Sequence, residues 1–206
     1  MSILLNLFGS KHKTKSKKAS KGVSKPPLKR VLVLDLDETL VHCVPEAGKG
    51  HLPLNITLPS GVVATASLNV RPFAKDLLQA AAEAFEIVVF TAADQFYADP
   101  VIDKLDPLGN LISQRLYRSD CTLVQGTYVK DLSILGRNLK DVILVDNSLS
   151  SCAFQEDNAV PILSWFDDCQ DTELLKLASY LKLAIRVSDV RLLNREVFGV
   201  NNLNGK

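Results

Sequence analysis

Three short apolar runs, each ending in polar or acidic residues, constrain the fold of this chain more than any other feature. Residues 31–37 read VLVLDLD, residues 85–92 read FEIVVFTA, and residues 141–148 read DVILVDNS. Continuous runs of this length, rich in β-branched residues, are typical of buried parallel strands. Because ligands of such sheets bind beyond the carboxyl ends of the strands, we expect the polar ends of the three runs to converge on one crevice.

Helical patterns lie between these runs, over residues 72–84 and 95–105. The alternation of strands and helices predicts an α/β fold, with a parallel sheet at the centre of three layers. Two further helices are expected over residues 171–183 and 189–198. With 206 residues and 47% hydrophobic content, the chain is long enough to bury one core of this kind.

Residues 52–69 interrupt the alternation. Apolar and polar residues alternate there on both sides of the turn sequence Pro59-Ser60-Gly61, which predicts a β-hairpin. We expect this hairpin to belong to a small antiparallel β insertion at about residues 44–70, between the first strand and its helix. Its expected place is over the crevice, as a small lobe.

Basic residues are concentrated at the N-terminal end. The first 34 residues carry nine lysine or arginine side chains and no acidic one, whereas the rest of the chain has 15 basic and 23 acidic side chains. We predict a basic flexible leader over residues 1–28 and one folded domain over residues 29–206. Three roles stay open for the leader: a solvated tail, contact with an anionic membrane surface, and nuclear import or nucleic-acid contact. The lysine run does not indicate specific nucleic-acid binding.

Several classes of site are not expected. The longest apolar runs span about six residues, too few for a membrane helix. The four cysteines lack CxxC spacing and only three histidines occur, which argues against a zinc site or a disulfide scaffold. No P-loop sequence for nucleotide phosphates is found. The expected location is intracellular, and the nucleus, the cytoplasm and the membrane periphery stay open.

The segment DLDETLVH, residues 35–42, carries the strongest chemical signal. Asp35 and Asp37 are two residues apart, so their side chains point to the same side of an extended chain. Two carboxylates at the end of a buried strand need a positive partner, and Mg²⁺ suits them because it takes oxygen ligands and substrate phosphate. One carboxylate can then attack phosphorus, while the other protonates the leaving oxygen and later activates water.

The same segment resembles the DxDxT signature of the haloacid dehalogenase (HAD) superfamily, whose fold is a Rossmannoid α/β sheet. The surrounding sequence resembles the FCP/SCP-like phosphatases, the group that carries the NIF domain and includes the RNA polymerase II C-terminal-domain (CTD) small phosphatases and Dullard. The matching stretches occur in family order over about residues 30–185: VLVLDLDETLVH, NVRPFAKDLL, FEIVVFTAADQFYADPVIDKLD, RLYRSDC, GTYVKDLSILGR, VILVDNS and NAVPILSWFDD.

The resemblance implies four catalytic residues. Asp35 is the expected nucleophile, which becomes phosphorylated, and Asp37 is the expected general acid and base. Thr91, in the sequence FTA, is expected to hydrogen-bond the transferring phosphoryl group. Lys130, in YVKD, is expected to neutralise the charge of that group and to hold Asp35.

The resemblance also implies a Mg²⁺ site and a substrate-binding group. Tyr97 and Arg118 match positions that line a peptide site. Thr39 is grouped with them, although holding the loop is its expected role. The Mg²⁺ site implied by the family pattern consists of Asp35, the backbone carbonyl of Asp37 and Asn147, with Asp146 supporting the metal through water.

Together these features predict a Mg²⁺-dependent protein serine/threonine phosphatase that forms an aspartyl phosphate. The substrate is expected to be the RNA polymerase II CTD or another phosphoprotein. Polymerase-directed members carry an aromatic residue shortly after the signature, in an apolar pocket for a substrate proline, whereas this sequence has Pro45 near that place. The choice of peptide therefore stays open. Two alternatives also stay open: a catalytically weak phosphoprotein-binding adaptor, and a small-molecule HAD phosphatase.

Overall fold

The computed structural model describes residues 28–199. The basic leader predicted over residues 1–28 therefore lies outside the described residues, except for Leu28 at its end. Within the described range, no helix has both the length and the apolar character needed to cross a membrane.

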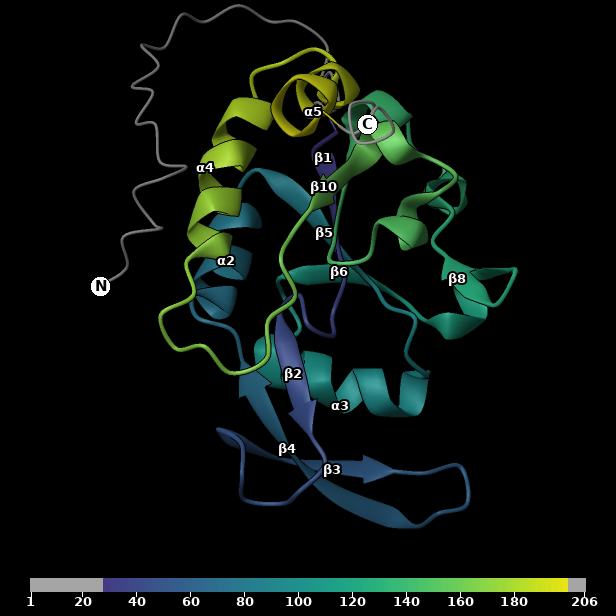
Figure 1. The fold of residues 1–206 in the computed structure, drawn as a ribbon, viewed down its shortest axis with the longest axis vertical. Helices are drawn as coiled ribbons and strands as arrows, with labels where there is room; N and C mark the ends of the chain where they lie inside the picture. Colours follow the sequence, from purple (N-terminus) through teal and green to yellow (C-terminus); the bar gives the residue numbers. More distant parts are fainter. Residues whose placement is uncertain (1–27, 200–206) are drawn as a thin grey trace, which may run out of the picture.

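A five-stranded parallel sheet forms the centre of the fold (Figure 1). The three predicted runs form β1, β5 and β9, and β1 lies between the other two, with Leu34 opposite Val89 on one side and Val145 on the other. The prediction of an α/β fold around a parallel sheet is confirmed. The strands, in their order across the sheet, are β10 (Ala159–Pro161), β9 (Val142–Asp146), β1 (Arg30–Leu34), β5 (Phe85–Phe90) and β6 (Ile112–Leu116).

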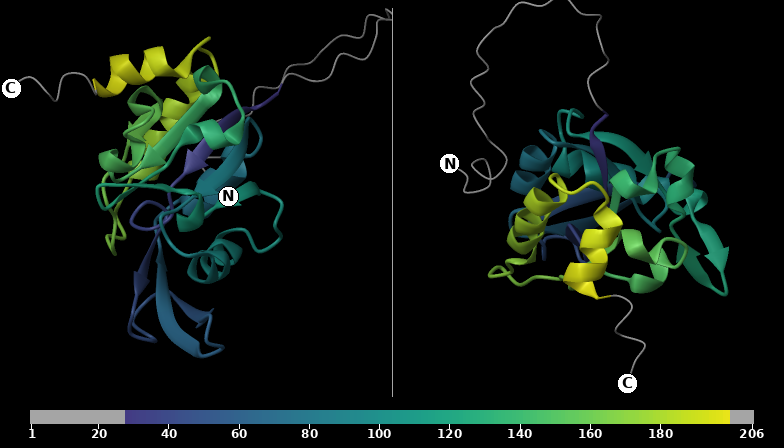
Figure 2. Two further views of the ribbon diagram at one scale, coloured as in Figure 1. Left: turned by 90° about the vertical axis from the view of Figure 1, so that its right-hand side faces the viewer. Right: turned by 90° about the horizontal axis from the view of Figure 1, so that it is seen from above.

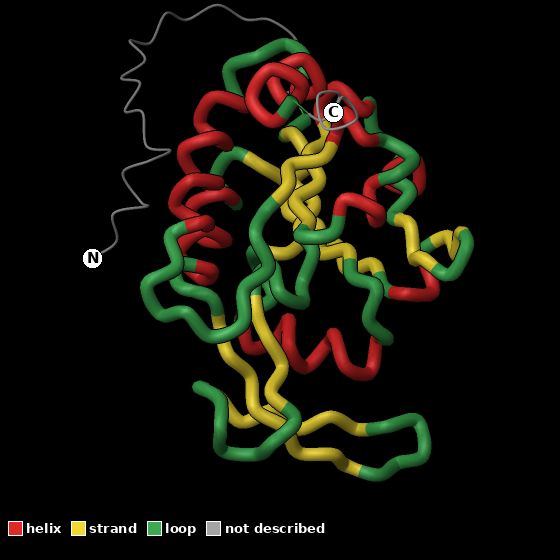
Figure 3. Tube along the Cα trace, viewed as in Figure 1, coloured by secondary structure: helices red, strands yellow, loops and turns green. Residues whose placement is uncertain are grey.

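Four α-helices contribute buried residues to the larger of two apolar clusters. Helices α2 and α4 pack against each other beside the sheet, as Figure 3 shows. Helix α2 starts two residues later than predicted because Phe73, just before it, has a left-handed backbone with φ of 68°. The helices are α2 (Ala74–Ala81), α3 (Gln95–Leu105), α4 (Glu173–Ala184) and α5 (Val190–Phe198).

The second apolar cluster is built from the other side chains of the strands and is covered mainly by short 3₁₀ helices. Val33 and Leu144 pack there with Leu132 and Cys152 from two of these helices. The layer on this side of the sheet is therefore assembled from single turns rather than from long helices. The 3₁₀ helices of this region are η2 (Leu132–Leu135), η3 (Leu139–Asp141), η4 (Leu149–Cys152) and η5 (Glu156–Asn158).

The insertion forms a separate three-stranded antiparallel sheet. It contains the predicted hairpin, with strands β3 (Leu52–Thr57) and β4 (Val63–Val70), and adds strand β2 (Val41–Val44) on the far side of β4. This small sheet projects from one end of the molecule, as Figure 2 shows in its left view. A second hairpin, β7 (Thr122–Val124) and β8 (Thr127–Val129), precedes η2.

Candidate active site

The carboxyl ends of β1, β5 and β9 meet at one edge of the sheet. Asp35 directly follows β1, Thr91 directly follows β5, and Asp146 is the last residue of β9. A pocket of about 390 Å³ opens at this edge, and all three residues line it. The structure therefore brings the polar ends of the three predicted strands into one crevice.

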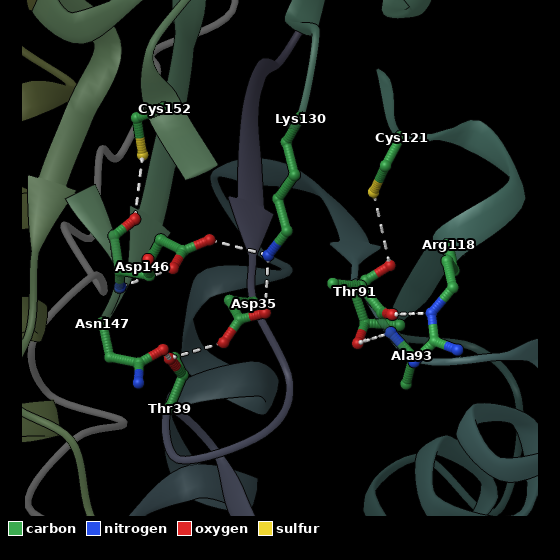
Figure 4. Close-up of polar contacts among 12 residues, drawn as sticks. Asp35, Thr39, Thr91, Ala93, Arg118, Cys121, Lys130, Asp146, Asn147 and Cys152 are labelled. Carbon is green, nitrogen blue, oxygen red and sulfur yellow. Dashed lines mark hydrogen bonds and ion pairs between the residues drawn. The ribbon is translucent and has the colours of Figure 1, made fainter. Parts of the chain in front are cut away.

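Lys130, directly after β8, lies at the centre of this crevice (Figure 4). Its Nζ atom donates hydrogen bonds to Asp35 Oδ1 at 2.5 Å and to Asp146 Oδ2 at 2.7 Å. Only 1% of the Lys130 surface is exposed. Burial acts to lower the pKa of Lys130, but the charges of Asp35 and Asp146 outweigh it and hold this pKa above its ordinary value. Lys130 is therefore a buried cation at neutral pH.

The two carboxyl groups around Lys130 have different surroundings. Burial, together with the negative charge of Asp35, raises the pKa of Asp146 above its ordinary value, although Lys130 acts to lower it. The other oxygen of Asp146, Oδ1, accepts a hydrogen bond from the backbone N–H of Ser148 at 2.7 Å. Lys130 thus pairs with two carboxyl groups, and Asp146 has a further hydrogen bond from the main chain.

Thr39 lies next to Asp35, as Figure 4 shows. Its Oγ1 atom donates to Asp35 Oδ2 at 2.9 Å and lies 3.3 Å from Asn147 Oδ1. Thr39 is fully buried and does not line the pocket. It has no surface for a substrate, which corrects its grouping with the substrate-side residues and leaves the loop-holding role.

Asp37 faces Tyr97, which comes from helix α3. The Tyr97 hydroxyl donates a hydrogen bond to Asp37 Oδ1. Burial raises the pKa of Asp37 to about 6, and the charges of Asp35 and Glu38 add to the rise, while the bond from Tyr97 opposes it. Tyr97 does not itself line the pocket, so the structure connects it to the site through Asp37.

Thr91 and Arg118 form the opposite wall of the pocket. The Thr91 Oγ1 atom accepts a hydrogen bond from the Ala93 backbone N–H at 3.0 Å. Arg118 is fixed by three contacts: its Nε donates to the Ala92 carbonyl at 2.7 Å, its Nη1 donates to Asp94 at 2.8 Å, and its guanidinium lies 5.3 Å from the ring centre of Tyr128. This wall therefore presents a hydroxyl and a cation.

Only oxygen atoms are available for a metal among the predicted ligands. Asp35 Oδ2 and Asn147 Oδ1 both approach the Thr39 hydroxyl, so they lie near each other. Over residues 28–199, no group of three or more His, Cys, Asp or Glu side chains is placed to hold an ion. The predicted set is of another kind, because it combines two carboxylates with a carboxamide and a main-chain carbonyl. Such a set suits a hard cation that keeps several waters.

The insertion sheet does not cover the pocket. No residue of β2, β3 or β4 lines it. Strand β2 follows the loop of residues 35–40, which we call the site loop, and leads away from it, and β3 packs against helix α3. The expected place of the insertion, as a lobe over the crevice, is therefore wrong, and the pocket lacks a lid from this segment.

The sequence-based prediction missed several residues that line the pocket, among them Glu38 and Tyr128. Glu38 has a left-handed backbone with φ of 56°. In a sequence, this conformation is indicated mainly by Gly, Asn or Asp, so a glutamate gives no sign of it. A signal for Tyr128 was present. It lies two residues before Lys130 in an extended segment, so both side chains point to the same side.

A family model described as "NLI interacting factor-like phosphatase" matches residues 30–191. The chain is 52% identical over 166 residues to "Probable C-terminal domain small phosphatase" of Dictyostelium discoideum. The aligned region covers 79% of this chain and 53% of that protein. It is 45% identical over 165 residues to the human "Carboxy-terminal domain RNA polymerase II polypeptide A small phosphatase 1", which covers 77% of this chain and 60% of that protein.

Among solved structures, a similar fold occurs in "The Structure of Fcp1, an essential RNA polymerase II CTD phosphatase". The TM-score is 0.59 at 20% sequence identity, over 86% of this chain and 55% of that chain. At this identity the likeness concerns the fold. The chain spans between 30% and 60% of the length of the curated relatives named here and of a further Dictyostelium relative, "CTD small phosphatase-like protein 2".

Proposed function

Because the chain belongs to the NLI interacting factor-like phosphatase family, we propose that it removes phosphate from phosphoserine or phosphothreonine side chains of a protein. The reaction proceeds through a phosphorylated Asp35. The observation that carries this proposal is the contact of one buried ammonium, Lys130, with both Asp35 and Asp146 at the bottom of an open pocket.

Asp35 is the nucleophile in this proposal. One of its carboxylate oxygens attacks phosphorus, and the bond between phosphorus and the serine or threonine oxygen breaks. Asp37 gives a proton to the leaving oxygen, and the hydroxyl-bearing product departs. Asp37 then takes a proton from water as the water attacks phosphorus, which releases inorganic phosphate and restores the Asp35 carboxylate. Its raised pKa, about 6, suits a group that both gives and takes a proton near neutral pH.

Thr91 and Lys130 stabilise the charge that develops on the transferring phosphoryl oxygens. The Lys130 ammonium already lies 2.5 Å from Asp35 Oδ1, so it is close to the reacting atom before substrate arrives. The Thr91 hydroxyl accepts its hydrogen bond from a backbone N–H, which leaves its own proton free to donate. Both donors line the same pocket, and each follows a different strand.

Mg²⁺ is the cofactor in this proposal, held by Asp35, Asn147, the Asp37 main chain and Asp146. The oxygen-only donor set and the four acidic side chains that line the pocket, Asp35, Asp37, Glu38 and Asp146, support it. When bound, the ion supplies charge neutralisation for the phosphate and for the Asp35 carboxylate.

A protein substrate is favoured by the shape of the pocket. The pocket is open, and the insertion that would form a lid lies elsewhere, so a phosphorylated side chain on an extended chain can enter. Arg118 and Tyr128 form a cationic and aromatic wall next to the phosphate position. The names of the relatives make the RNA polymerase II CTD the first candidate, with other phosphoproteins as further ones.

The test is phosphate release from a phosphoserine CTD peptide and from p-nitrophenyl phosphate, with Mg²⁺, with EDTA, and with the Asp35→Asn variant. We expect release from both substrates with Mg²⁺, loss of release in EDTA, recovery when Mg²⁺ is restored, and no release by Asp35→Asn. Binding of the peptide without any release would favour an adaptor. Hydrolysis of p-nitrophenyl phosphate, with no phosphate release from any member of a phosphopeptide panel, would favour a small-molecule phosphatase.

A further inference from the structure

Arg71 lies where three parts of the fold meet, and only 1% of its surface is exposed. It directly follows β4, and its backbone N–H donates to the Leu40 carbonyl at 3.0 Å. Its Nη1 donates to the Thr39 carbonyl at 3.1 Å. Its Nε and Nη2 donate to the two carboxylate oxygens of Asp171 at 2.9 and 2.8 Å. Arg71 therefore connects the end of the insertion sheet, the site loop and the segment before α4.

Asp171 is itself held in place. Its Oδ1 atom also accepts the backbone N–H of Glu173, the first residue of α4, at 3.1 Å. Although burial acts to raise the pKa of Asp171, the guanidinium of Arg71 lowers it below the ordinary value, so the pair is ionised at neutral pH. A two-point contact between a planar guanidinium and a carboxylate fixes direction as well as distance. We call this pair the Arg71–Asp171 clamp.

The clamp reaches the reacting carboxylate through one residue. The carbonyl of Thr39 is bound to Arg71, and the hydroxyl of the same residue donates to Asp35 Oδ2 at 2.9 Å. Asp35 Oδ1 is bound to Lys130 on the other side. The orientation of the carboxylate thus depends on two holders, and one of them, Thr39, is fixed by the clamp.

We propose that the Arg71–Asp171 clamp is a positioning element that sets the orientation of the Asp35 carboxylate through Thr39. This inference rests on the proposed function of Asp35 as nucleophile. Arg71 does not line the pocket and is buried, so it offers no surface to a substrate. Because small misplacements of a reacting group are costly, the clamp acts on the rate of the chemical step rather than on substrate binding.

Arg30 offers a matched control, because it is another largely buried arginine with the same kinds of partner. It donates to the carbonyls of Ala184 and Val187 and lies 3.4 Å from Asp141. It stands at the amino end of β1, whereas the site lies at the carboxyl end. A purely structural effect of losing a buried arginine fork should therefore appear at Arg30 as well as at Arg71.

The experiment is a double-mutant cycle with Arg71→Lys and Thr39→Val, measured as kcat and KM for p-nitrophenyl phosphate. Lysine keeps the charge for Asp171 but cannot form the fork, and valine keeps the shape of threonine without its hydroxyl. We expect each single variant to lower kcat by about 10–100-fold with little change in KM. The double variant should be no slower than Thr39→Val alone, because the clamp acts through that hydroxyl. Arg30→Lys should lower the melting temperature and leave kcat in place.

Hydrogen exchange gives a second readout that does not depend on turnover. The amides of residues 36–41 should exchange faster in Arg71→Lys than in the wild-type protein, and at the wild-type rate in Arg30→Lys. Asp171→Asn replaces Arg71→Lys in the cycle if the latter does not fold.

Two results would overturn the inference and leave the proposed function intact. The first is a double variant in which the two reductions of kcat multiply, and the second is an Arg71→Lys variant with unchanged kcat. An inactive wild-type protein would instead contradict the proposed function, and the exchange of the loop amides would then decide whether the clamp holds the loop.

Discussion

The chemistry of the site depends on one buried lysine between two buried carboxylates. Lys130, Asp35 and Asp146 are all at least nine-tenths buried, and such charges are tolerated in a protein interior only when they are paired. In the proposed mechanism this pairing also serves the chemistry, because it keeps the ammonium next to the Asp35 carboxylate that is proposed to attack phosphorus. Lys130 thus has two roles in this account: it neutralises buried carboxylates at this edge of the sheet, and it holds Asp35 in the proposed site.

Replacement of this lysine should therefore affect stability and turnover together. We expect Lys130→Met to lower kcat by at least about 100-fold, because a donor to the transferring phosphoryl group is lost. We also expect the free energy of unfolding to fall by about 3–5 kcal/mol, because two neighbouring carboxylates lose their partner. Steady-state kinetics and urea unfolding measure the two effects. Lys140→Met, at an exposed lysine, is the control, and wild-type turnover in Lys130→Met would refute the role.

At the scale of single elements, the connection between α3 and β6 is held by one carboxylate. Asp106 is buried and accepts the backbone N–H groups of Asn110, Leu111 and Ile112 at 3.2, 2.9 and 2.9 Å. Burial acts to raise the pKa of Asp106, but these hydrogen bonds outweigh it and lower the pKa below its ordinary value. The ionised form is therefore favoured by folding.

This shift predicts a pH dependence of stability. The stabilisation is complete above the pKa of an unfolded aspartate, about 4, and is lost as the pH falls below that value and through the lower pKa of the folded state. We expect Asp106→Asn to lower the free energy of unfolding by about 1–3 kcal/mol at pH 7. The difference from wild type should shrink toward pH 3 in urea titrations. A difference that stays constant between the two pH values would contradict the assignment.

The insertion sheet should be separable from the chemistry. A Cβ atom at Gly50 would lie 2.7 Å from the Cβ of Ser67 on β4, so one of these two backbone segments must move. We expect Gly50→Ala to destabilise the protein by about 1–3 kcal/mol, measured by thermal unfolding. Hydrolysis of p-nitrophenyl phosphate by the folded protein should be unchanged, because this sheet does not line the pocket. A large loss of kcat would show that the insertion takes part in the chemistry.

At the scale of the whole molecule, the strands and helices that could be predicted from the sequence are those with a regular hydrophobic pattern. The runs at β1, β5 and β9 and the helix over residues 95–105 were predictable because their patterns are long and regular. Strand β6, with the sequence ISQRL, and the three-residue strand β10 carry no such pattern and form because neighbouring strands offer hydrogen-bond partners.

The candidate site divides in the same way. The acidic strand ends and Lys130 were predictable from motifs in the chain. Two contacts could not be predicted in this way. Tyr97 and Asp37 are 60 positions apart in the chain, and Arg71 and Asp171 are 100 positions apart. Such contacts arise from packing in three dimensions, and a single sequence has no local signal for them.

The basic N-terminal segment should be independent of the catalytic domain. Residues 1–27 lie outside the described structure, and β1 begins at Arg30. We expect a protein that lacks residues 1–27 to hydrolyse p-nitrophenyl phosphate at the wild-type rate. If the lysines bind an anionic surface, the truncation should also abolish sedimentation with phosphatidylserine vesicles at low salt, with phosphatidylcholine vesicles as control. A large loss of turnover would place the segment in the enzyme.

The central claim is that Asp35 becomes phosphorylated, and trapping that species tests it most directly. Asp37→Asn should slow the release of phosphate from Asp35, because the base that activates water is missing. Incubation of this variant with p-nitrophenyl phosphate and Mg²⁺, followed by acid quenching and peptide mapping, should give an acid-stable, hydroxylamine-sensitive phosphate on the peptide that contains Asp35. An aryl phosphate is used because nitrophenolate leaves without the proton that Asp37 gives to a serine oxygen. The same adduct should be absent from the Asp35→Asn variant. Release of phosphate by Asp35→Asn, or an adduct on another residue, would contradict the account.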